Sequence, residues 1–153
     1  MGRPGMDLKK YIRTVLDFPI KGIEFRHITS LVENPQSFNY ALMQLTNDCM
    51  DFKADKIIGI ESRGFVFGAP LARDLEVPFV MARKPGKLPG QCYTQSYKLE
   101  YGEASLSIQC NTPIRSTDKI VIIDDLIATG GTAIACADIL YNAFEVAKEN
   151  ILI

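Results

Sequence analysis

The chain has 153 residues, of which 47% are hydrophobic, and its formal net charge is −1. This length predicts one domain with a buried core, and the near-neutral charge argues against a nucleic-acid-binding surface. No apolar run is long enough to span a membrane and no signal-peptide pattern is present, so we expect no membrane anchor. We expect the domain to cover residues 7–153, with residues 1–6 as a cloning remnant or a disordered lead.

The first third of the chain predicts helices separated by a loop. Apolar residues at helical spacing favour a short amphipathic helix over residues 7–15, and residues 18–29 are expected to form a loop. Asn34 followed by Pro35 is typical of a helix start, since Asn caps the first turn and Pro fits its first position. Apolar residues then recur at helical spacing as far as Phe52.

The rest of the chain predicts strands that alternate with helices. Helical patterns cover residues 64–75, which include Pro70, and residues 132–144. Short apolar runs indicate buried strands at Lys56–Ile60, Val77–Ala82, Lys119–Asp124 and Ile151–Ile153. This alternation predicts an α/β fold with a parallel central sheet flanked by helices. Residues 83–109 contain several Pro and Gly residues and predict a long loop followed by an exposed hairpin, a length typical of a lid or binding loop.

The cysteines indicate the expected compartment. They form no Cys-x-x-Cys pair, and two of them lie in apolar, helical patterns; the four are Cys49, Cys92, Cys110 and Cys136. This usage predicts reduced thiols in a cytoplasmic protein.

The segment from Val121 to Thr132 carries the strongest functional signal. A buried strand ends in Asp124 and Asp125, a loop of Thr and Gly follows, and a helix begins directly after it. Amide groups at a helix start bind phosphate, glycines let the backbone approach it, and carboxylates at a strand end suit the hydroxyls of a ribose. The segment therefore predicts a sugar-phosphate site, the alternative being acids that only cap the next helix. It is neither a Walker loop nor a dinucleotide fingerprint, since it lacks the following Lys and the G-x-G-x-x-G spacing.

Two further segments predict binding of anions near this site. At Ile60–Phe65 a strand again leads through a polar turn and a glycine into a helix, and Arg63 can bind two phosphate oxygens at once. Residues 83–90 are basic and contain two prolines, and they follow a strand at the same edge of the sheet. Each segment alone could be an ordinary solvated turn. Together with the first segment they favour neutralisation of a leaving pyrophosphate.

The strand, acid pair and Thr/Gly loop at 121–132 resemble the phosphoribosyl-pyrophosphate (PRPP) motif of type I phosphoribosyltransferases. Three other segments are similar to those of the adenine phosphoribosyltransferases, and they are Gly22–Thr29, Arg83–Gly90 and Leu99–Gly102. The resemblance implies transfer of a phosphoribosyl group from PRPP to adenine, giving AMP and pyrophosphate for purine salvage through an oxocarbenium-like transition state. It also implies Mg²⁺ as cofactor, a homodimer, and a hood and a flexible lid hairpin beside the sheet.

The resemblance implies contacts to each part of PRPP. The 5′-phosphate would be held by Ala128, Thr129, Gly130, Gly131 and Thr132. The ribose would be bound by Asp124 and Asp125, either of which would contact Mg²⁺ through water. The pyrophosphate would be met by Glu61, Ser62, Arg63, Arg83, Lys84 and Lys87. Arg83 would act across the dimer interface, and the Glu61–Ser62 peptide bond would be cis.

The resemblance also implies a purine site and a lid. Phe25 would stack on the adenine, while the backbone around Glu24 and Arg26 would read its amino group and ring nitrogen. Glu100 would be the catalytic acid–base group, carried on the lid next to Tyr101. A base that arrives only on closure suits chemistry from which water must be excluded.

Two features of the sequence depart from the family pattern. His27 stands where the family usually has Asp, and we interpret it as a loop-structuring residue. The chain ends about where the family's next strand begins, so the C-terminal strand is expected to be incomplete.

Two alternative functions stay open. A relative that uses hypoxanthine, guanine or xanthine is one alternative, although backbone reading near Phe25 favours a 6-amino group. A non-enzymatic PRPP sensor is the other, but it predicts an added DNA-binding segment and does not need Glu100.

Overall fold

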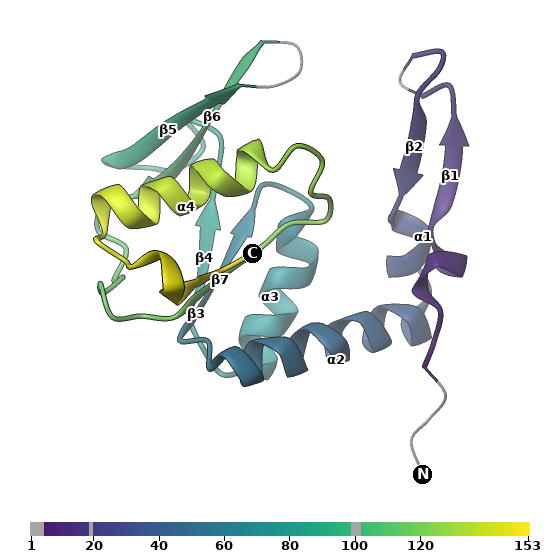
Figure 1. Cartoon of the computed structure of the whole chain (residues 1–153), viewed down its shortest axis with the longest axis horizontal. Helices are drawn as coiled ribbons and strands as arrows, with labels where there is room; N and C mark the ends of the chain where they lie inside the picture. Colours follow the sequence, from purple (N-terminus) through teal and green to yellow (C-terminus); the bar gives the residue numbers. More distant parts are fainter. Residues whose placement is uncertain (1–4, 19, 99–101) are drawn as a thin grey trace. The chain divides into compact units, whose positions relative to one another are not determined.

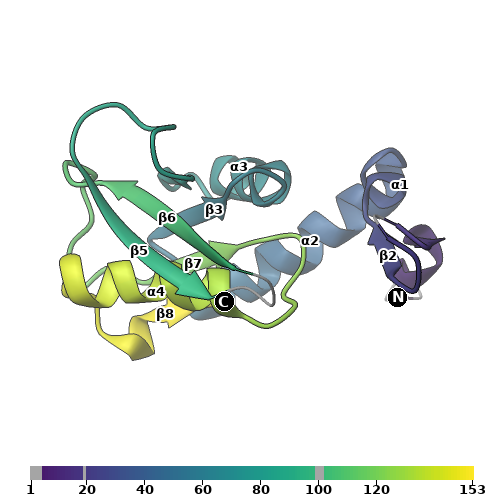
Figure 2. The same ribbon diagram turned by 90° about the horizontal axis from the view of Figure 1, so that it is seen from above.

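A computed structural model describes residues 5–18, 20–98 and 102–153. The chain divides into two compact units, Met1–Asn47 and Asp48–Ile153, which are described separately below. Figure 1 shows both units, and strand β8 is labelled in Figure 2. Within the described ranges, no helix combines the length and the apolar character needed to cross a membrane.

The N-terminal unit differs from the predicted helix and loop. The helical prediction over residues 7–15 is correct only for a single 3₁₀ turn, Leu8–Tyr11, which is followed by strand β1, Arg13–Leu16. The predicted loop contains strand β2, Glu24–His27, which pairs with β1 in antiparallel register from Arg13–His27 to Leu16–Glu24. Every residue of β1 is exposed, so pairing with β2, and not burial, determines its conformation.

Helix α2, Pro35–Phe52, begins where the sequence predicts and follows a short helix α1, Thr29–Val32. The Asn34 side chain accepts hydrogen bonds from the backbone N–H groups of Gln36 and Ser37, at 3.1 and 3.0 Å. These bonds satisfy donors that the first turn leaves unpaired. The Asn-Pro start is therefore confirmed, with the cap in its expected role.

The C-terminal unit is built on a parallel sheet of four strands in the order β4-β3-β7-β8. The strands are β3, Lys56–Ile60; β4, Phe79–Ala82; β7, Ile120–Ile123; and β8, Ile151–Leu152. Helices α3, Gly64–Asp74, and α4, Gly131–Ala143, lie on opposite faces of this sheet (Figure 2). The predicted α/β architecture is confirmed.

Alternation along the strands explains the two covered faces. Ile58 and Ile60 of β3 join Ile139 and Leu140 of α4 in the main core cluster. On the other face, a Cβ atom on Gly59 would overlap the ring of Phe79 of β4 and lie 3.0 Å from the ring of Phe65 of α3. Successive side chains of a strand point to opposite faces, so one buried strand serves both helices.

The hairpin of β5, Cys92–Lys98, and β6, Glu103–Gln109, also lies where the sequence predicts it. The prediction that it is exposed is wrong for β6, because Leu106 and Ile108 belong to the buried core beside α4. The backbone groups of Arg83 and Ser107 exchange hydrogen bonds of 3.0 and 2.7 Å, which tie β6 to the end of β4. The stem of the hairpin is thus fixed to the sheet.

Candidate active site

The carboxyl ends of β3 and β7 meet at one edge of the sheet, since the parallel register places Gly59 beside Ile123. The residues that follow the two strands therefore face a common space. They line a cavity of about 480 Å³ together with side chains from β5, α4 and the segment after β4. Its lining includes Glu61, Ser62, Arg63, Lys84, Tyr97, Asp124, Asp125, Leu126 and Thr132.

The two predicted ribose ligands lie together at the end of β7. Asp125 accepts a 2.9 Å contact from Nε of Arg63 and is only 7% exposed, whereas Arg63 is 52% exposed and accessible to a ligand. The backbone N–H of Asp125 donates to Asp124 at 2.8 Å. Burial, together with the neighbouring Asp125 carboxylate, raises the pKa of Asp124 to about 6. Asp124 is therefore mostly ionised at neutral pH and takes up a proton as the pH falls through about 6.

The loop at the start of α4 has the geometry of an anion site. Gly130 has φ of +80°, a conformation that glycine adopts without strain, and α4 begins at the next residue. The hydroxyl of Thr129 accepts a long hydrogen bond of 3.4 Å from Gly131, and the loop lines a smaller cavity of about 110 Å³ that shares Asp124 and Thr132 with the larger one. The first-turn amides of a helix lack partners within the helix, so they are available to a phosphate.

Two glycines allow close approaches at this edge. A Cβ atom on Gly64 would overlap the carbonyl oxygen of Ile123, so α3 begins directly against the end of β7. A Cβ atom on Gly131 would lie 3.3 Å from the carbonyl oxygen of Lys98, so the end of β5 lies against the loop before α4. The glycines thus let three segments converge on one cavity.

Two of the predicted pyrophosphate residues form an ion pair with one another. Arg83 binds both carboxylate oxygens of Glu61, with Nη2–Oε1 at 3.0 Å and Nε–Oε2 at 3.3 Å. The Arg83 hydrogen bonds hold the pKa of Glu61 below its ordinary value. The Glu61–Ser62 peptide bond is cis, as expected. Lys84 lines the large cavity, whereas Lys87 is exposed beyond it.

The predicted purine residues belong to β2 in the N-terminal unit. The half-buried ring of Phe25 packs edge-on against Phe18 at 5.2 Å and lies 6.2 Å from the ring of His27. Arg26 forms a 3.7 Å ion pair with Glu24. Glu100 and Tyr101, the predicted acid–base and lid residues, lie outside the described residues.

Sequence reasoning missed Tyr97, which lines the cavity from β5 and packs against the core cluster. The alternation of side chains along β5 could have identified it, because Tyr93, four residues earlier on the same face, packs edge-on against Phe144 at the end of α4.

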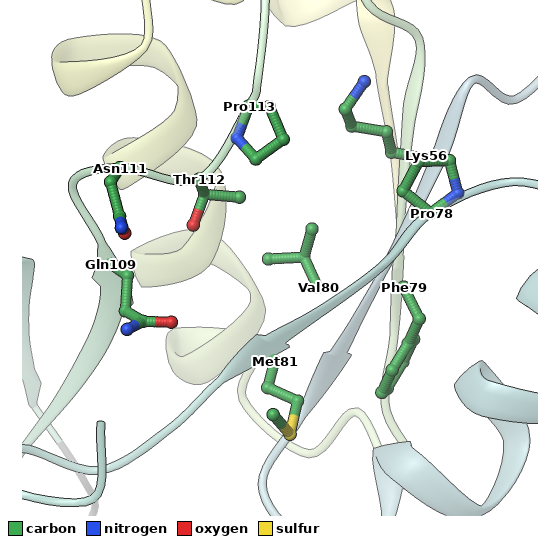
Figure 3. Close-up of a pocket in the computed structure, with 9 residues that line it drawn as sticks. All are labelled: Lys56, Pro78, Phe79, Val80, Met81, Gln109, Asn111, Thr112 and Pro113. Atoms are coloured by element: carbon green, nitrogen blue, oxygen red, sulfur yellow. The ribbon is translucent and has the colours of Figure 1, made fainter. Parts of the chain in front are cut away.

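A second cavity, of about 320 Å³, lies beside β4 and is lined partly by Val80, Met81 and Gln109 (Figure 3). No predicted site residue lines it.

Comparison with known proteins identifies the family of the chain. Residues 27–147 match the family described as phosphoribosyl transferase domain. The adenine phosphoribosyltransferase of Microcystis aeruginosa is 51% identical over 137 residues, covering 88% of this chain and 79% of that protein.

Solved structures give the same result. Adenine phosphoribosyltransferase from Thermoanaerobacter pseudethanolicus is 41% identical with a TM-score of 0.84, covering 96% of this chain and 81% of that one. The Saccharomyces cerevisiae enzyme, solved with adenine and an iminoaltritol bisphosphate, is 36% identical with a TM-score of 0.81, covering 96% and 82%. The chain therefore belongs to the phosphoribosyl transferase domain family and, within it, to the adenine phosphoribosyltransferases.

Proposed function

We propose that this chain transfers the phosphoribosyl group of PRPP to adenine and releases AMP and pyrophosphate, a reaction of purine salvage. The observation that carries the proposal is the cavity lined by Asp124 and Asp125, by Arg63 and Lys84, and by Thr132 at the end of the proposed phosphate loop. These groups match the ribose, the pyrophosphate and the 5′-phosphate of one substrate. The named relatives support adenine as the acceptor.

Each part of the substrate has a proposed partner. Amides from Ala128 to Thr132 hold the 5′-phosphate, and Asp124 and Asp125 bind the ribose hydroxyls. Breaking the bond between C1′ and the pyrophosphate oxygen leaves an oxocarbenium-like carbon, as in glycoside cleavage. Arg63 and Lys84 then lower the barrier, because cations placed at the departing pyrophosphate stabilise the charge that develops there.

The acid pair fits a role for Mg²⁺ that depends on the substrate. Among residues 5–18, 20–98 and 102–153, no group of three or more His, Cys, Asp or Glu side chains could form a protein-only metal site. Mg²⁺ commonly uses one or two carboxylates together with substrate phosphates, and Asp124 and Asp125 supply such carboxylates at the cavity. When bound, Mg²⁺ supplies positive charge that neutralises the pyrophosphate oxygens.

The purine step is assigned to residues outside the PRPP cavity. Phe25 stacks on adenine, the backbone at Glu24 and Arg26 reads its edge, and Glu100 handles its proton when the lid beside Tyr101 closes. Closure excludes water, which would otherwise hydrolyse the activated ribose. We further propose that the enzyme works as a homodimer in the cytoplasm.

Product formation from each base tests the proposal. Purified full-length chain with PRPP and Mg²⁺ should form AMP from adenine and release pyrophosphate, with little turnover of hypoxanthine or guanine. Preferred turnover of a 6-oxopurine would instead assign the chain to the alternative substrate class. PRPP binding without turnover of any base would contradict the enzymatic proposal and favour a sensor.

A further inference from the structure

The carboxylate of Glu61 contacts two consecutive residues of the basic segment. It accepts both hydrogen bonds of the Arg83 guanidinium, and its Oε2 also accepts the backbone N–H of Lys84 at 2.9 Å. The remaining terminal nitrogen of Arg83, Nη1, donates to the carbonyl of Lys87 at 3.1 Å. Glu61 thus holds the start of the segment Arg83–Lys87, and Arg83 in turn binds the carbonyl at its end.

We propose that Glu61 is a positioning residue, which fixes the segment Arg83–Lys87 so that Lys84 faces the pyrophosphate. This inference rests on the proposed function and revises the roles of two predicted ligands. Arg83 and Glu61 bind one another, so each already has a partner within the chain. In the described part of the chain, the side chains of Lys84 and Lys87 form no ion pair, which leaves both charges available.

The surroundings make this ion pair a rigid one. The Glu61 and Arg83 side chains are only 15% and 29% exposed, so solvent screens their attraction less than that of a surface pair. The Glu61 N–H donates to the carbonyl of Ala82 at 2.9 Å, and the Arg83 backbone is bonded to Ser107. Both backbones are therefore held by the sheet, and the side-chain contacts extend that order into the segment that follows.

Replacing the carboxylate by an amide should release the segment. Glu61→Gln keeps the size of the side chain but leaves one acceptor oxygen in place of two, and its NH₂ group faces donors. The variant therefore cannot satisfy Arg83 and Lys84 together. We expect the KM for PRPP to rise about tenfold, as for loss of a charge-assisted hydrogen bond, with a smaller change in kcat.

The test uses the full chain with Glu61→Gln, Arg83→Gln and the double variant. If Glu61 acts through Arg83, the double variant should raise the KM for PRPP no more than the larger single effect. Trypsin cleavage after Lys87, followed by mass spectrometry, should become faster in each variant. Asp74→Asn is the matched control, since it removes the carboxylate of another Arg ion pair, with Arg73, and should change neither readout.

The outcomes separate this inference from the proposed function. Additive KM effects would mean that Glu61 and Arg83 act independently on the ligand, which overturns the positioning role. Unchanged cleavage after Lys87 in Glu61→Gln would overturn it as well, and this readout needs no turnover. If the wild-type chain forms no AMP but cleavage still rises in the variants, Glu61 orders the segment while the proposed function fails. Arg83→Lys, which keeps the charge but loses the paired donors, should also speed cleavage and serves if Glu61→Gln does not fold.

Discussion

The ionised form of the Asp124 carboxyl group is less favourable in the folded chain than in water. Its pKa is raised from 3.8 to about 6, chiefly by burial. Between these values the folded chain binds more protons than the unfolded chain, so the contribution of Asp124 to stability falls as the pH rises from about 4 to about 6. Above that window the ionised carboxylate destabilises the fold. The chain retains it, which is expected of a group that serves binding.

Asp124→Asn should therefore stabilise the protein at neutral and higher pH. Asn removes the buried charge but keeps an oxygen that can accept the 2.8 Å hydrogen bond from Asp125. We expect the free energy of unfolding to increase by about 2 kcal/mol at pH 8 and to change little at pH 4. Denaturant titrations at both pH values measure this, with the exposed Asp51→Asn as control. Equal stabilisation at pH 4 and pH 8 would contradict the assigned cause.

The sequence predicted which residues gather at this edge better than how they pair. Asp124 and Arg63 follow buried strands, so their placement depends only on the strand ends meeting, which a parallel sheet ensures. The contact of Arg63 with Asp125, and that of Arg83 with Glu61, depend on the register between strands and on side-chain rotamers. The local sequence pattern therefore does not predict either contact.

The junction between α3 and β7 depends on one glycine. Gly64 stands where a Cβ atom would overlap a backbone carbonyl, that of Ile123, and no side-chain rotation can relieve such an overlap. Gly64→Ala should lower the free energy of unfolding by about 2 kcal/mol or more, because the start of α3 must move off the sheet. Thermal and denaturant unfolding measure this. Val66→Ala, at an exposed site on the same helix, is the control, and equal losses in the two variants would contradict the close-approach argument.

The sequence predicted the strands that burial determines better than those that depend on pairing with another segment. Strands β3 and β7 are entirely buried, and their short apolar runs are unambiguous. Strand β1 is entirely exposed, and its apolar spacing fitted a helix equally well until pairing with β2 decided it. The inner side of β6 was missed for a related reason, since only the position of α4 shows that Leu106 is covered.

The proposed reaction divides its two substrates between the two units of the chain. The predicted adenine ligands, including Phe25, belong to Met1–Asn47, whereas the PRPP cavity, including Thr132, belongs to Asp48–Ile153. Substitutions in one unit should therefore affect one substrate. This division offers a test in which each variant is the control for the other.

Phe25→Leu should weaken the binding of adenine and leave the binding of PRPP unchanged. Leu keeps an apolar side chain at this half-buried position but removes the flat ring on which a base stacks, a contact with a free energy of about 1–3 kcal/mol. We expect the KM for adenine to rise about tenfold, with the Kd for PRPP unaltered. Thr132→Val removes only a hydroxyl at the phosphate loop. It should raise the Kd for PRPP and leave the KM for adenine unchanged. Steady-state kinetics and calorimetric PRPP titration measure both. If Phe25→Leu weakened PRPP as much as adenine, the ring would be supporting the fold of the chain and not the purine, and the assignment of Phe25 would be wrong.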